Sequence, residues 1–140
     1  MATQSSPADG AQSLRRYFTA IASLDPERIV ACFRSDGELE DPIGTGVRHG
    51  SDEIREYWAK GLCAAAVAAD IDIIAVLPAG RSVAAHWQMS ARTGSGARAR
   101  AEGIDVLQLD SAGLIQRAEG YWDQAAFRAA LMNHPDSRTS

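Results

Sequence analysis

The sequence predicts an α+β domain in which a curved antiparallel sheet, covered on one side by helices, forms a cone around an apolar pocket. Apolar residues recur at helical spacing as far as about residue 62, and they alternate with the period of a strand from residue 70 onwards. Turns that contain glycine or proline separate the alternating segments, as hairpin connections require. Helices followed by hairpin-connected strands are typical of the α+β class, and 140 residues suit a single domain.

Spacing and capping signals predict four helices. The first covers about residues 11–23. A short second helix begins at Pro26, because Asp25 supplies an N-cap and proline suits the first helical position. Ser51 is expected to cap the third helix, whose first turn carries acidic residues near the positive end of its dipole. A last helix over 123–132 closes the chain.

Alternating apolar patterns predict five strands, over residues 38–41, 70–77, 83–92, 99–109 and 114–122. A turn over residues 34–37 is expected to lead into the first of them. Residues 1–10 and 135–140 are rich in Ser, Pro, Thr and Asp, and we expect them to be disordered tails. The domain is therefore expected to cover residues 11–134.

Composition narrows the possible functions. The net charge of −4 and the pI near 5.3 argue against nucleic acid as a default partner. No apolar run approaches the length of about 20 residues that a bilayer span needs, and the N-terminus lacks a signal-peptide pattern, so we expect a cytoplasmic protein without membrane contact. Cys32 and Cys63 are expected to be reduced thiols, and His49, His86 and His134 lack the spacing of metal ligands.

Two aspartates occupy positions where the strand pattern calls for an apolar residue. Asp41 shares a strand face with Leu39 and Ile43, and Asp105 shares one with Leu107. A carboxylate on an apolar face must be paired, neutralised through a raised pKa, or used in chemistry. These two positions therefore predict a pocket with acid–base chemistry.

Each aspartate has a structural and a functional interpretation. Asp41 is either a strand-end residue that accepts hydrogen bonds from a turn or a general base freed where Pro42 interrupts strand pairing. Asp105 is either paired with a buried arginine, placed at a subunit interface, or kept protonated so that it can donate a hydrogen bond. The pattern around Asp105 favours the last of these, because its apolar neighbours lie on both sides in mid-strand.

The aromatic residues are ambiguous from periodicity alone. Tyr17 lies on the apolar stripe of the first helix, where a tyrosine is usually a core residue whose hydroxyl is satisfied at the edge. Trp58, Trp87 and Trp122 provide aromatic surface for either a core or a pocket.

Several of these segments together resemble one protein family. They are Tyr17-Phe18-Thr19-Ala20-Ile21, Glu40-Asp41-Pro42-Ile43-Gly44, His49-Gly50, Ile104-Asp105-Val106 and Gly120-Tyr121-Trp122. In this combination the chain resembles the bacterial Δ5-3-ketosteroid isomerases, over about residues 12–125. These enzymes belong to the cone-shaped superfamily named after nuclear transport factor 2.

The resemblance implies a role for each matching residue. Asp41 matches the general base that removes a proton next to a steroid carbonyl and returns it two carbons along the chain of bonds. Tyr17 and Asp105 match the two donors of the oxyanion hole. The resemblance further implies a small, apolar, steroid-like ketone as substrate, no metal or organic cofactor, and a homodimer. The expected substrate-binding positions are Phe33, Trp58, Trp87, Met89 and Trp122.

The chain departs from the family at two positions. Phe33 and Trp58 match tyrosines that support the oxyanion tyrosine in some members, although Tyr57 lies next to Trp58 in the sequence. Two other functions therefore remain open. One is a SnoaL-like cyclase or dehydratase that uses Asp41 on another carbonyl substrate, and the other is a non-catalytic dimer that binds an apolar ligand.

Overall fold

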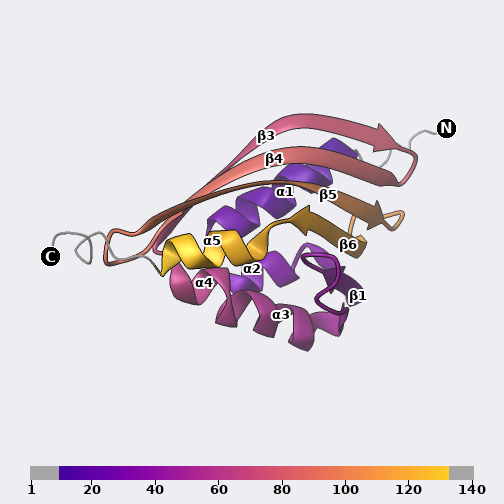
Figure 1. Ribbon diagram of the computed structural model, residues 1–140. Helices are drawn as coiled ribbons and strands as arrows, with labels where there is room; N and C mark the ends of the chain where they lie inside the picture. The colour runs from indigo at the N-terminus through magenta and orange to yellow at the C-terminus, as the bar shows by residue number, and fades with distance from the viewer. Residues whose placement is uncertain (1–9, 133–140) are drawn as a thin grey trace, which may run out of the picture.

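The computed structural model describes residues 10–132. Figure 1 shows a curved sheet whose one face is covered by the helices. The predicted tail over 135–140, and all of the tail over 1–10 except Gly10, lie outside the described residues. Gly10 itself begins the first helix and is buried against Val83.

The helices are α1 Gly10–Ala22, α2 Pro26–Val30, α3 Gly50–Lys60, α4 Leu62–Ala65 and α5 Gln124–Leu131. The predicted cap of α2 is confirmed, because the Asp25 carboxylate accepts a hydrogen bond from the Glu27 N–H at 3.0 Å. The predicted cap of α3 is wrong. The N-cap is His49, and the Glu53 carboxylate reaches back to accept from its backbone N–H at 2.8 Å. Within residues 10–132, every helix is too short or too polar to traverse a lipid bilayer.

The sheet has six strands, in the order β2-β1-β6-β5-β4-β3. They are β1 Phe33–Glu40, β2 Arg48–His49, β3 Ala68–Ala79, β4 Ser82–Arg92, β5 Arg98–Leu109 and β6 Ile115–Trp122. Strands β3 to β6 form the predicted run of antiparallel neighbours, but β1 and β6 pair in parallel. Three hairpins connect β3, β4, β5 and β6. The last of these strands pairs with β1 in the parallel direction, so the sheet is mixed.

The predicted turn over residues 34–37 is part of β1 instead. Phe33 pairs with Ile115 but Glu38 pairs with Arg117, so β1 bulges between these two paired positions. Gly37 lies within this bulge, where a Cβ atom would come within 3.0 Å of a backbone oxygen. The turn-forming residues therefore bend a strand without ending it.

The inner face of the sheet carries the core and the candidate chemistry. Along β4 the side chains of Trp87 and Met89 are buried, in alternation with more exposed neighbours, as the sequence predicted. Along β5 the same alternation buries Asp105 on the inner face with Leu107. The register between β5 and β6 places Asp105 directly opposite Gly120. Because side chains alternate along a strand, the Asp105 carboxylate points toward the helices.

Candidate active site

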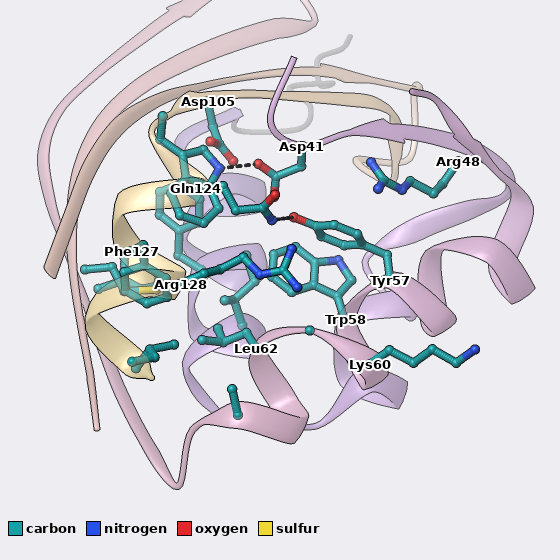
Figure 2. A pocket seen from close by; sticks show the side chains of 18 of the residues that line it. Asp41, Arg48, Tyr57, Trp58, Lys60, Leu62, Asp105, Gln124, Phe127 and Arg128 are labelled. Carbon is teal, nitrogen blue, oxygen red and sulfur yellow. Dashed lines mark hydrogen bonds between the residues drawn. The ribbon is translucent and has the colours of Figure 1, made fainter. Parts of the chain in front are cut away.

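A cavity of about 720 Å³ lies between the inner face of the sheet and the helices α1, α3 and α5. Its size is within the range of small-molecule sites, roughly 300–1,000 Å³. Figure 2 shows the side chains that line it. Six of the predicted site residues reach its surface: Asp41, Trp58, Trp87, Met89, Asp105 and Trp122.

Asp41 lies just beyond the end of β1 and is only 5% exposed. The indole N–H of Trp122, at the end of β6, donates a hydrogen bond to Asp41 Oδ1 at 2.6 Å. The turn that follows stays attached to β6, because the Ile43 N–H donates to the Gly120 carbonyl at 2.8 Å. The carboxylate is therefore held at the cavity wall by one tryptophan, and it is not consumed by turn hydrogen bonds.

Asp105 lies in the middle of β5 and is 6% exposed. The indole N–H of Trp87 donates to Asp105 Oδ1 at 2.9 Å. Ala85 is the residue directly opposite Asp105 on β4, so Trp87 lies two positions further along the same face and reaches the carboxylate diagonally. The partner of Asp105 is thus an indole, where one interpretation of the sequence expected a buried arginine.

Gly120 brings the two carboxylates together. A Cβ atom built on Gly120 would lie 2.2 Å from Asp41 Oδ1 and 3.2 Å from Asp105 Oδ1. Both carboxylates therefore approach the same point in space, and that point is open only because residue 120 has no side chain. The rings of Trp87 and Trp122 meet edge to face, with centroids 5.9 Å apart, so two tryptophans in contact hold two carboxylates.

The environments of the two carboxylates differ. Burial raises the pKa of Asp41 to about 6, and the N–H of Trp122, the charge of Arg48 and the hydroxyl of Tyr57 oppose this rise. Burial also raises the pKa of Asp105 well above its ordinary value, and the negative charge of Asp41 raises it further. Only the Trp87 N–H opposes the rise at Asp105. Asp105 is therefore the member of the pair that is harder to ionise beside a charged Asp41.

Tyr17 and Phe33 are not among the residues that line the cavity, and a contact of Phe33 with substrate stays a prediction. Tyr17 is completely buried, and its ring packs edge-on against Phe33 at 5.4 Å and Trp58 at 6.4 Å. Its hydroxyl has no hydrogen-bond partner among residues 10–132. Burial raises the pKa of Tyr17, as do the nearby charges of Asp105 and Asp41. The charges of both carboxylates therefore act on this hydroxyl, although Tyr17 is not among the residues that line the cavity.

Tyr57 and Gln124 are site residues that the sequence did not identify. The Gln124 amide donates to the Tyr57 hydroxyl at 3.0 Å (Figure 2), which leaves the Tyr57 proton free to point elsewhere. That hydroxyl lowers the pKa of Asp41, and the Arg48 guanidinium lies 4.3 Å above the Tyr57 ring. The only sequence signal was the adjacency of Tyr57 to Trp58, because helical spacing does not show that neighbouring positions both reach one cavity.

Both histidines among residues 10–132 pair with carboxylates away from the cavity. His49 Nδ1 lies 3.2 Å from a Glu38 carboxylate oxygen, and His86 pairs with Glu102. Both cysteines are free thiols. Among residues 10–132, no three His, Cys, Asp or Glu side chains gather in the manner of metal ligands. The polar groups that do reach the cavity are carboxylates, a phenol, indoles, an amide and cations.

Comparisons with known proteins agree with this architecture. The SnoaL-like domain family matches residues 14–118. A steroid Delta-isomerase from Nocardioides simplex is 32% identical over 113 residues, which cover 79% of this chain and 86% of that protein. The structure of SalBIII, described as an epoxide hydrolase/cyclase-like enzyme in pyran ring formation in the polyether salinomycin, superposes with a TM-score of 0.72. That likeness covers 84% of this chain and 92% of SalBIII at 24% identity, so it concerns the fold alone. The predicted nuclear transport factor 2-like fold is confirmed, and the chain belongs to the SnoaL-like family.

Proposed function

We propose that the protein is a steroid Δ-isomerase, which moves a C=C bond into conjugation with a 3-keto group through a dienolate. One observation carries the proposal. Two buried carboxylates, Asp41 and Asp105, approach the same point beside Gly120, and the pKa of Asp105 is raised both by burial and by the negative charge of Asp41. A proton transfer next to a ketone is catalysed by a charged base at the carbon and a hydrogen-bond donor at the carbonyl oxygen.

In this mechanism, Asp41 removes the proton from the carbon next to the carbonyl, because it is the ionised member of the pair. The negative charge that develops moves to the carbonyl oxygen, to which the protonated Asp105 donates a hydrogen bond. Asp41 then returns the proton two carbons further along. The Trp122 N–H holds Oδ1 of Asp41, and Oδ2 is the oxygen that carries the proton between the two carbons.

Tyr17 is the second donor to the carbonyl oxygen in this proposal. Its hydroxyl is buried, lacks a partner among residues 10–132, and lies near both carboxylates. A carbonyl oxygen that enters beside Asp105 gives this hydroxyl an acceptor, and the buried group gains the hydrogen bond that it otherwise lacks. The likeness of the chain to a steroid Delta-isomerase, at 32% identity over most of both proteins, supports the same type of reaction.

A direct assay tests the proposal. The enzyme is mixed with a β,γ-unsaturated 3-ketosteroid, and the ultraviolet absorbance of the conjugated enone is followed. We expect turnover by the wild type, a large loss in Asp41→Asn and Asp105→Ala, and tolerance of Phe33→Tyr, whose position lies outside the cavity wall. No gain in absorbance at high concentrations of folded enzyme would reject the isomerase.

A second candidate is an acid–base cyclase or dehydratase of the same family. The observation that favours it is that Tyr17 is not among the residues that line the cavity, because a reaction without a two-donor oxyanion hole needs only the carboxylate pair. Asp105→Asn separates the candidates. An amide still donates a hydrogen bond to an enolate, so the isomerase keeps part of its rate, whereas a reaction that takes a proton from Asp105 is abolished.

A further inference from the structure

The cavity has different polar groups at its two ends. At the buried end are the Asp41 and Asp105 carboxylates, and between the ends the lining is mostly apolar. The more exposed end, called the mouth here, carries charged side chains of both signs: Arg48, Glu53, Glu56, Lys60 and Arg128. A side chain at the mouth is available to bind a ligand only if it lacks a hydrogen-bond or ion-pair partner within the protein.

Four of the five charges are already engaged. Arg48 donates to the Thr45 hydroxyl at 2.9 Å, and its guanidinium also stacks on an aromatic ring. Lys60 pairs with Glu56 at 2.6 Å, across one turn of α3. Glu53 accepts a hydrogen bond from the backbone N–H at the start of that helix, at 2.8 Å. Each of these four side chains is therefore held by a neighbour within residues 10–132.

Arg128 is different. It lies on α5, is exposed, and its guanidinium makes no hydrogen bond or ion pair with any residue between positions 10 and 132. Figure 2 shows its side chain extending from α5 across the cavity toward α3. An apolar cavity that has a free guanidinium at its mouth can bind an anion there, because a guanidinium matches the two oxygens of a carboxylate.

We propose that Arg128 forms an anion-binding subsite, and that the substrate is an amphipathic ketone with a carboxylate at the end remote from the keto group. This inference rests on the proposed function, since it places the ketone at Asp41 and Asp105. The charge on Asp41 repels a second anion at the buried end of the cavity, while Arg128 attracts one at the mouth. The two charges together set the direction in which the substrate enters.

The test uses two forms of one molecule, a β,γ-unsaturated 3-ketosteroid whose side chain ends in a carboxylic acid and the methyl ester of the same acid. The two differ in charge and hardly in shape. We expect the wild type to show a KM about 5–10-fold lower for the acid, with a similar kcat, because a guanidinium–carboxylate pair at a partly exposed site contributes modestly. The advantage of the acid should shrink in about 0.5 M salt, which screens exposed charges.

Three variants assign the effect to one side chain. Arg128→Gln should bring the ratio of the two KM values close to one. Lys60→Gln should keep the preference for the acid, because the Lys60 ammonium is already paired with Glu56. Arg81→Gln, in the turn between β3 and β4, removes the same charge away from the cavity and should also keep the preference. A wild-type ratio near one, or an unchanged ratio in folded Arg128→Gln, overturns the subsite.

A binding measurement separates this inference from the isomerase proposal. The conjugated product acid and its methyl ester need no turnover, and their affinities can be read from the fluorescence of the tryptophans that line the cavity. Tighter binding of the acid that depends on Arg128, without any isomerisation, supports the subsite and rejects the isomerase. Turnover of both compounds with equal affinities overturns the subsite and leaves the isomerase standing.

Discussion

Replacing Asp41 by asparagine should make the protein more stable while it removes activity. Burial raises the pKa of this carboxyl from its ordinary 3.8 to about 6, so the folded state holds a proton more tightly than the unfolded state does. Stability is therefore lost as the pH rises from 3.8 toward about 6, because the folded protein must then carry a buried charge. An amide has no charge to bury, and it keeps an oxygen that can accept from Trp122 at the position 2.6 Å away.

The shift in pKa sets the magnitude. For a rise from 3.8 to about 6, the gain in the free energy of unfolding of Asp41→Asn is about 0.5 kcal/mol at pH 4 and about 3 kcal/mol at pH 7. Above pH 7 the gain should stay level. At pH 7 it corresponds to a rise in Tm of roughly 8–12 °C for a chain of this length.

Urea unfolding at pH 4 and pH 7, followed by far-ultraviolet circular dichroism, measures this difference. Asp72→Asn is a matched control, because it makes the same chemical change on an exposed residue of β3 and should alter stability by no more than about 0.5 kcal/mol at either pH. A gain for Asp41→Asn that is equal at both pH values, or a loss at pH 7, would contradict the argument that Asp41 is a buried charge.

Three further predictions concern the site and the assembly. Gly120→Ala should lower kcat by about 100-fold in a folded protein, because the new Cβ would lie 2.2 Å from Asp41 Oδ1 and must displace that carboxylate; steady-state kinetics with circular dichroism as a folding control would show this. Tyr57→Phe should move the acidic limb of the kcat/KM profile above pH 6, because the Tyr57 hydroxyl lowers the pKa of Asp41; an unmoved limb would remove Tyr57 from the site. The expected homodimer should sediment as two chains and dissociate in Ile104→Lys, since Ile104 and Tyr121 are exposed cross-strand neighbours on the outer face of the sheet; a monomeric wild type would reject it.

The sequence predicted the elements of the fold well where the signal was local. Period-two alternation identified β4 and β5 and put Asp105 on the buried face, because the direction of a strand side chain depends only on its parity. The start of α2 was also predicted correctly, since the capping residue and the helix it caps are neighbours in the chain. Turn chemistry was misleading at residues 34–37, where pairing with β6 keeps the segment in a bulged strand.

The arrangement of the site was decided by contacts between residues far apart in the chain. Alternation showed that Asp41 and Asp105 face inward, but only the pairing of β6 with both β1 and β5 places them beside Gly120. The hydrogen bond from Gln124 to Tyr57 joins residues 67 positions apart, and the sequence around neither residue predicts it. The sequence alone thus determined which side chains are costly to bury, because that follows from residue type and strand parity. The tertiary structure determined which of them meet, because that depends on the register of distant strands and on the space left by one glycine.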